Sequence, residues 1–72
     1  LDLVLVEGFK YEPVAKILLF RSDTGHGINE LTLDEHVIAV ASDISLSLQV
    51  PVLDINNAEE IVGFIQQWMR SY

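Results

Sequence analysis

Residues 3–8 read Leu-Val-Leu-Val-Glu-Gly, and this stretch decides the fold class of the chain. Four apolar residues follow one another without a polar interruption, and the run ends at an acid and a glycine. Three later runs share this pattern: Ile-Leu-Leu-Phe at 17–20, Val-Ile-Ala-Val-Ala at 37–41 and Val-Leu-Asp-Ile at 52–55. Continuous apolar runs that end in polar residues are typical of parallel strands buried on both faces. The sequence therefore predicts an α/β fold with a mostly parallel sheet.

The C-terminal part of the sequence has the pattern of one long amphipathic helix. Asn57 is placed to cap its first turn, and Glu60, three residues later, can complete a capping box. Arg70 lies in the last turn, where the helix dipole favours a cation. Apolar residues recur between them at helical spacing, at Ile61, Phe64, Ile65, Trp68 and Met69. We expect this apolar stripe to pack on the sheet as core.

The segment 44–50 alternates apolar and polar residues, which fits either a short half-buried strand or an extended connector. Turn-forming residues at both ends, Asp43 and Pro51, favour the connector. The connectors 8–16 and 43–50 are short for parallel crossovers, so antiparallel neighbours, or strands from outside this sequence, remain as alternatives. One helix of about 14 residues, roughly 21 Å long, covers two strands on one face at most. We therefore expect the other face of the sheet to have no cover within these residues.

Composition narrows the class of protein. The 72 residues carry a formal net charge of −7 and include no cysteine. Nucleic acid and anionic membranes are disfavoured as partners, because both attract concentrated positive charge. Without cysteine, a disulfide scaffold, a thiolate zinc site and a cysteine nucleophile are excluded. No apolar run has the roughly 18 residues that a membrane span needs, so we expect a globular cytoplasmic piece.

The pair Glu7-Gly8 is the most informative candidate site. In open α/β sheets, ligands bind beyond the carboxyl ends of the strands. A carboxylate there can hold Mg²⁺ through a water, or orient a water beside a nucleotide phosphate. The glycine allows a sharp turn and lets a ligand approach the backbone. The alternative for Glu7 is an acid at a strand end that contacts only solvent.

Two lysines, Lys10 and Lys16, flank Pro13 in a loop that we expect to leave the same end of the sheet as Glu7. Lysines in such a loop can meet phosphates as point charges, although solvated surface lysines fit the pattern equally well. Arg21 follows the second run and is expected to be a surface charge that ends the strand.

The acid that closes the third run is a further candidate. The Asp43 carboxylate can accept hydrogen bonds from the N1–H and the exocyclic amine of guanine. The alternative is a turn aspartate that accepts its own backbone N–H groups. The two histidines, His26 and His36, are not spaced as ligands on one element and have no obvious acidic or thiolate companion. They predict no metal site.

Read in order, Val6-Glu7-Gly8-Phe9-Lys10, Pro13, Lys16-Ile17 and Arg21 resemble the molybdopterin-guanine dinucleotide biosynthesis adapter (MobB) family. The stretches 37–43 and 52–56 are similar to later strands of that family, and the helix that contains Trp68 is similar to its C-terminal end. Ala15 departs from members that carry a second proline before the lysine.

The resemblance implies a fold, a ligand and partners. Residues 1–72 would be the C-terminal part of a single P-loop nucleotide-binding α/β domain, whose phosphate-binding loop lies upstream. The family binds GTP, hydrolyses it weakly if at all, and works beside the guanylyltransferase that attaches GMP to molybdopterin. Glu7 would match its acid near Mg²⁺, and Lys10 and Lys16 would match its loop lysines. The fragment alone should not bind GTP tightly.

Two other functions remain open at this point. Dethiobiotin synthetases also carry a Val-Glu-Gly string after a buried strand, which leaves an ATP-dependent ligase as the alternative. An acidic interaction module without a ligand is the third reading. Because an uncovered sheet face or edge favours association, we expect the isolated chain to self-associate and the protein to form a homodimer.

Overall fold

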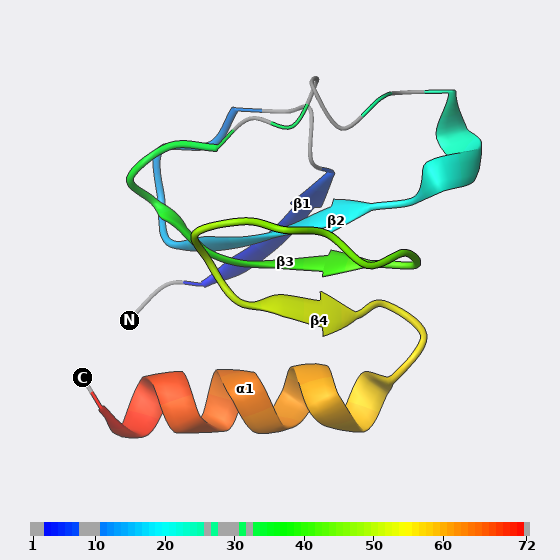
Figure 1. The fold of residues 1–72 in the computed structure, drawn as a ribbon. Coiled ribbons are helices and arrows are strands. Elements are labelled where there is room, and N and C mark those ends of the chain that lie inside the picture. Colours follow the sequence, from blue (N-terminus) through cyan, green and yellow to red (C-terminus); the bar gives the residue numbers. More distant parts are fainter. Residues whose placement is uncertain (1–2, 8–10, 26, 28–30, 32, 72) are drawn as a thin grey trace.

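The computed structural model describes residues 3–7, 11–25, 27, 31 and 33–71. These residues form one sheet of four strands followed by a helix, with a short 3₁₀ helix after the second strand (Figure 1). The elements are β1 (Val4–Glu7), β2 (Lys16–Phe20), η1 (Ser22–Thr24), β3 (Val37–Ser42), β4 (Val52–Asp54) and α1 (Ala58–Arg70). None of the helices formed by the described residues has the length and apolar character that crossing a membrane requires.

The strands lie side by side in the order β1-β2-β3-β4, and each neighbouring pair is parallel. The expected α/β fold with a parallel sheet and a C-terminal helix is confirmed. The alternative of antiparallel neighbours is wrong for these strands, because a crossover does not need a helix when the strands are this short. Fully extended, the connector 43–51 reaches about 30 Å, whereas the short strand β4 starts only about 10 Å back along the sheet.

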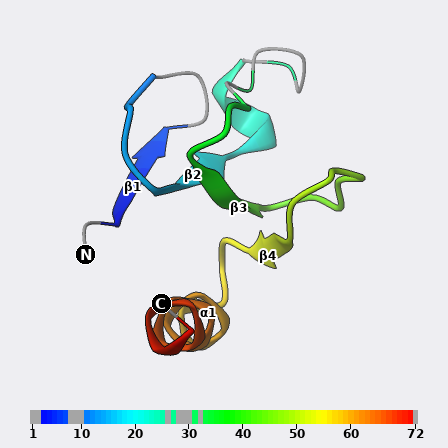
Figure 2. The same cartoon turned by 90° about the vertical axis from the view of Figure 1, so that its left-hand side faces the viewer.

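One face of the sheet is covered by α1. Buried side chains gather on this face, from Ile17, Ala39, Ala41 and Leu53. The helix packs on them through Ile61, Phe64 and Ile65. Figure 2, which views α1 end-on, shows that the helix lies beside β4 and away from β1. Leu5 of β1 is accordingly 50% exposed, so one helix does not span the width of the sheet.

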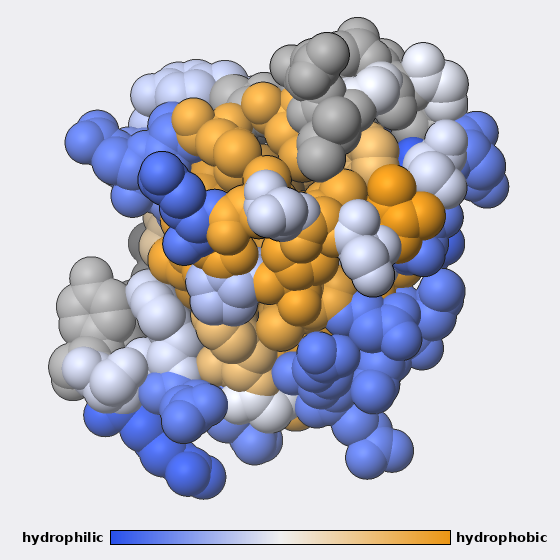
Figure 3. Space-filling view, in the orientation of Figure 1, coloured by the Kyte–Doolittle hydropathy of each residue, from blue (hydrophilic) through white to orange (hydrophobic). Residues whose placement is uncertain are grey.

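The other face has a cover, and the expectation that it would be bare is wrong. Its buried side chains are Leu18, Phe20, Val37 and Val40. The connector after β3 forms no strand, as expected, but it folds across this face, and its period-two pattern directs apolar side chains onto the sheet. Side chains packed on the buried group are Val6, Leu31, Leu46, Leu48 and Val50. The covering side chains are themselves apolar, and hydrophobic surface shows in the middle of the molecule in Figure 3.

A β-bulge sets which side chains of β3 share a face. Lys16 pairs with Val37, but the next residue, Ile17, pairs with Ala39, so Ile38 is an extra residue in β3. A bulge of this kind changes the alternation of side chains along the strand. It allows Val37 and Val40 to lie on the same face although they are three residues apart.

The start of α1 is capped largely as expected. Asn57 Oδ1 accepts the backbone N–H of Glu60 at 3.1 Å. The predicted return bond from Glu60 to the backbone N–H of Asn57 does not form, because that N–H already donates to the Asp54 carbonyl at 2.9 Å. Glu60 Oε2 instead accepts the backbone N–H of Asp54 at 3.2 Å. The acid therefore connects the first turn of α1 to the end of β4.

Candidate functional site

The carboxyl ends of all four strands meet at one edge of the sheet, here named the carboxyl edge. It consists of Glu7 at the end of β1, Ser22 after β2, Asp43 after β3 and Asp54 at the end of β4. Glu7 is exposed and pairs in register with Leu19. Neighbouring strands lie about 4.8 Å apart, so the ends of β1 and β3 are separated by roughly 10 Å. Two of the predicted site residues, Glu7 and Asp43, thus share this edge.

Ser22, which follows the neighbouring strand β2, is the main partner of the Asp43 carboxylate, and the residue's own backbone N–H also contributes. The backbone N–H of Ser22 donates to Oδ1 at 2.9 Å, and the Ser22 hydroxyl donates to Oδ2 at 3.0 Å. The Ser22 N–H is the main reason that the pKa of Asp43 lies below its usual value, while partial burial opposes the shift. The carboxylate is therefore ionised at neutral pH. Since an ionised carboxylate has about four acceptor positions, it retains capacity for further donors.

From the sequence, either guanine or the residue's own backbone was expected as the partner of Asp43, and its own backbone N–H is indeed one cause of the lowered pKa. The observed partner, Ser22, was missed because it is 21 residues away in sequence. A signal was present: Ser22 follows the second apolar run as Asp43 follows the third. In a parallel sheet, two such positions are neighbours on the same edge.

A polar pocket of about 320 Å³ opens beside Asp43, between the ends of β3 and β4. Its lining comes from Ser42, Asp43, Ile44, Ser45, Val52, Leu53, Asp54 and Glu60. All three of its acids accept backbone N–H groups: Asp43 from Ser22, Asp54 Oδ1 from Asn56 at 2.9 Å, and Glu60 from Asp54. The sequence analysis did not identify this pocket.

Lys16 does not belong to the carboxyl edge. It is the first residue of β2 and pairs with Val4, so it lies at the opposite end of the sheet from Glu7. The prediction of a loop position at the same end as Glu7 is therefore wrong. Alternation along β2 turns the Lys16 side chain onto the face of Leu18, where it is fully buried.

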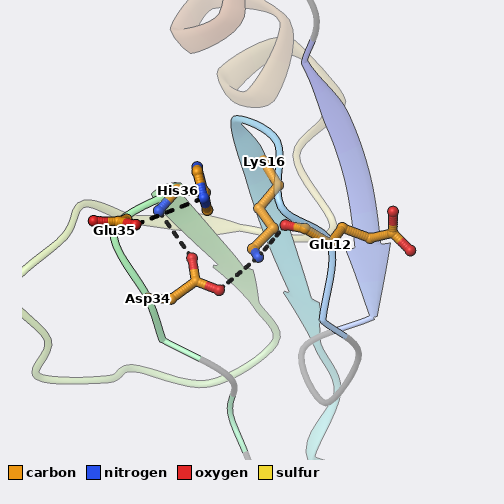
Figure 4. A network of polar contacts seen from close by, with 5 residues as sticks. All are labelled: Glu12, Lys16, Asp34, Glu35 and His36. Carbon is orange, nitrogen blue, oxygen red and sulfur yellow. Dashed lines mark hydrogen bonds and ion pairs between the residues drawn. The ribbon is translucent and has the colours of Figure 1, made fainter.

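The buried ammonium group is fully engaged by the chain itself (Figure 4). Lys16 Nζ donates to the Glu12 carbonyl at 2.6 Å and to Asp34 Oδ2 at 2.9 Å. It also lies 5.1 Å from the centre of the Tyr11 ring, within cation–π range. These contacts join the connectors before β2 and before β3 to the sheet, and they favour a structural role for Lys16.

Asp34 and the residues after it form the rest of this group. The Lys16 hydrogen bond is the first cause of a lowered pKa for Asp34, whose other oxygen accepts the His36 backbone N–H at 2.8 Å. His36 Nε2 lies 3.9 Å from a Glu35 carboxylate oxygen, so it does have an acidic neighbour. Within the part of the chain that the structure describes, no three His, Cys, Asp or Glu side chains are grouped to hold a metal ion.

Three of the residues named from the sequence, Gly8, Lys10 and His26, lie outside the described residues. Among the described residues, Glu7 is the one whose carboxylate would lie at the expected Mg²⁺ site. One or two carboxylates, with waters and substrate phosphates, are the usual ligands of Mg²⁺ in nucleotide sites. The donor chemistry of Glu7 therefore fits such an ion.

The fold defines an α/β protein with a parallel sheet, a carboxylate-bearing carboxyl edge and a C-terminal helix. Residues 1–43 match the family model described as molybdopterin guanine dinucleotide synthesis protein B (MobB). The chain belongs to this family, which confirms the resemblance seen in its sequence.

Two relatives extend the match to nearly the whole chain. Over 70 residues, 97% of this chain, it is 57% identical to the molybdopterin-guanine dinucleotide biosynthesis adapter protein of Escherichia coli (strain K12). Over 71 residues, or 99% of the chain, it is 45% identical to the protein of the same name from Haemophilus influenzae (strain ATCC 51907 / DSM 11121 / KW20 / Rd). The chain spans about 40% of the length of these relatives. Both carry the name of an adapter protein, and these comparisons give no support to the ATP-dependent alternative.

Proposed function

We propose that the full-length protein is a GTP-binding adapter in the biosynthesis of molybdopterin guanine dinucleotide. Membership of the MobB family supports this proposal, and the names of both relatives give the adapter role in molybdopterin-guanine dinucleotide biosynthesis. The carboxyl edge is the observation that carries the nucleotide-binding part, because Glu7 and Asp43 lie where open α/β sheets bind ligands. The chain would form the C-terminal part of one P-loop-type α/β domain, with the phosphate-binding loop upstream.

In this proposal Glu7 acts on the Mg²⁺ that accompanies GTP. Bound Mg²⁺ would supply positive charge that bridges and neutralises the phosphates. The exposed carboxylate at the end of β1 would hold a water of the ion and so fix its position at the edge. Gly8 and Lys10, which follow Glu7 in the sequence, are proposed to meet the phosphates. A nucleotide contact for Lys16 stays a prediction that no observed contact supports.

The adapter role implies a protein partner. The guanylyltransferase that joins GMP to molybdopterin is the enzyme that such an adapter would assist, in the cytoplasm, with weak GTP hydrolysis at most. A homodimer is supported by β1, which ends the strand order and presents a half-exposed Leu5. An edge strand offers unpaired backbone groups to a second chain.

Calorimetric titration of the full-length protein with GTP, at several Mg²⁺ concentrations, tests the proposal. We expect binding that strengthens with Mg²⁺, and we expect Glu7→Gln to reduce the Mg²⁺-dependent part about tenfold, the loss of one charge-assisted hydrogen bond. Glu35→Gln is the matched control, since Glu35 is an exposed acid at the other end of the sheet. No GTP binding by a protein with an intact phosphate loop would refute the proposal.

The pathway role has its own readout. Purified guanylyltransferase, molybdopterin and Mg·GTP can be mixed with and without the full-length protein, and molybdopterin guanine dinucleotide measured. An adapter raises the yield or the rate, whereas an unrelated GTP-binding protein changes neither.

A further inference from the structure

We propose that the pocket between the carboxyl ends of β3 and β4 receives the guanine base of the nucleotide, and that Asp43 selects guanine there. This inference rests on the proposed GTP binding and adds which residues distinguish the base. All the residues on which it rests lie at the carboxyl edge, at the opposite end of the sheet from the Lys16–Asp34 pair.

The size and the mostly polar lining of the pocket suit a small, partly polar ring. Its volume of about 320 Å³ lies in the range of small-molecule sites. Half-buried Val52 and Ile44, which is 44% exposed, are apolar residues of the lining, whereas the Leu53 side chain is packed in the core under α1. Asp43, the residue directly after β3, is one of the residues that line the pocket. A base on Val52 and Ile44 would present its edge to the carboxylate.

The geometry of Asp43 favours one base over the others. Ser22 binds both carboxylate oxygens, which fixes the plane of the group while leaving each oxygen further acceptor capacity. Guanine presents two adjacent donors, N1–H and the exocyclic amine, that match two carboxylate oxygens. Adenine presents an acceptor at N1 and would face the carboxylate with no donor at that position. Sites that bind a donor group reject analogues that lack it, because the buried acceptor is left unpaired.

The other two acids of the pocket have partners within the chain. Asp54 accepts the N–H of Asn56 and Glu60 accepts the N–H of Asp54, which holds both beside the start of α1. Asp43 differs because its main partner, Ser22, belongs to the end of the neighbouring strand β2. The ends of β1 and β3 lie roughly 10 Å apart, so a single nucleotide can extend along the edge with its phosphates toward Glu7.

Base analogues test the inference on the wild-type full-length protein. Dissociation constants are measured for GTP, ITP, XTP and ATP by competition at fixed Mg²⁺. ITP lacks the exocyclic amine and should bind roughly 10- to 100-fold more weakly than GTP, the effect of losing a hydrogen bond to a charged group. XTP has a carbonyl in place of that amine, which would face the carboxylate, so it should also bind more weakly than GTP. Equal affinities for GTP and ITP would overturn the inference.

Asp43→Asn gives a result that a structural role cannot produce. The carboxamide offers an N–H₂ donor to the carbonyl of xanthine, so GTP should weaken tenfold or more while XTP strengthens, reversing the preference. Asp23→Asn, an exposed acid of η1 at the same edge, is the control and should keep the wild-type order. Equal weakening of GTP and XTP by Asp43→Asn would overturn the inference.

The two proposals fail in different ways. If the wild-type protein binds no GTP, the proposed function fails. If it binds GTP but does not discriminate among the bases, the proposed function stands and only the role of Asp43 is lost. If Asp43→Asn does not fold, which circular dichroism shows, the ITP comparison on the wild-type protein still decides.

Discussion

At the residue scale, Lys16 shows how the position of one side chain within a strand decides its role. A shift of one residue moves it from a loop into β2, and alternation then turns it onto a buried face. Burying a charge is costly unless it is paired, and Asp34, the Glu12 carbonyl and the Tyr11 ring provide the pairing.

Replacing Lys16 tests this structural role. Lys16→Met keeps most of the side-chain volume but removes the ammonium group, so it should lower the free energy of unfolding by about 2–3 kcal/mol. Denaturant unfolding of the full-length protein measures the loss. Arg70→Met is the control, because Arg70 is exposed in the last turn of α1 and should cost less than about 1 kcal/mol. Equal stabilities of the two variants would contradict the role.

The carboxylates of Asp34 and Asp43 predict a pH dependence of stability. Hydrogen bonds from Lys16 and from the Ser22 backbone lower their pKa values below the ordinary 3.8. Below that pH the unfolded chain binds more protons than the folded one, so stability falls with falling pH. The contribution of these two carboxylates to the free energy of unfolding is present above about pH 4. It is lost as the pH falls through their pKa values in the folded state.

Thermal melting between pH 7 and pH 2.5 measures this dependence. We expect a plateau above pH 5 and a decline below pH 4. The double variant Asp34→Asn/Asp43→Asn should start with a lower melting temperature and decline less steeply. A decline of unchanged steepness would mean that other groups cause it.

Residue roles could be predicted where they depend on the ends of strands. Glu7 and Asp43 share an edge because parallel strands place their carboxyl ends together, which the pattern of runs already indicated. The Asp34 partner of Lys16 and the Ser22 partner of Asp43 lie 18 and 21 residues away. The order of the runs indicates that Ser22 and Asp43 share an edge, but no local pattern indicates that Asp34 pairs with Lys16.

At the element scale, α1 was predicted from local sequence with its cap and its apolar face. The connector after β3 was predicted as a connector, but its path across the second face was not, because period two fixes which side chains share a side and not what they touch. The bulge at Ile38 was also missed, since no glycine or other punctuating residue interrupts the run 37–41.

The N-cap of α1 allows a matched test with neighbouring asparagines. Asn57→Ala removes the side-chain acceptor for the Glu60 N–H and should cost about 1 kcal/mol of stability. Asn56→Ala retains the backbone N–H that donates to Asp54, so it should change little. Chemical denaturation measures the free energy of unfolding of both variants and so distinguishes the two roles. If Asn56→Ala lost more stability than Asn57→Ala, the assignment of Asn57 as the N-cap would be wrong.

At the scale of the whole molecule, the sequence predicted a parallel sheet with one helical layer, and the structure has both. The expectation of a bare second face failed because it counted only helices as cover. The connectors help to bury Leu18, Phe20, Val37 and Val40 on that face with side chains that are themselves apolar.

The central claim is that Mg·GTP binds at the carboxyl edge of this sheet. Hydrogen–deuterium exchange of the full-length protein, with and without Mg·GTP, tests it most directly, because backbone amides report where a ligand lies. The account predicts slower exchange in peptides that contain Glu7, Ser22 and Ile44, and unchanged exchange around Lys16 and His36. Protection confined to the Lys16 end, or none in this part of the protein, would contradict it.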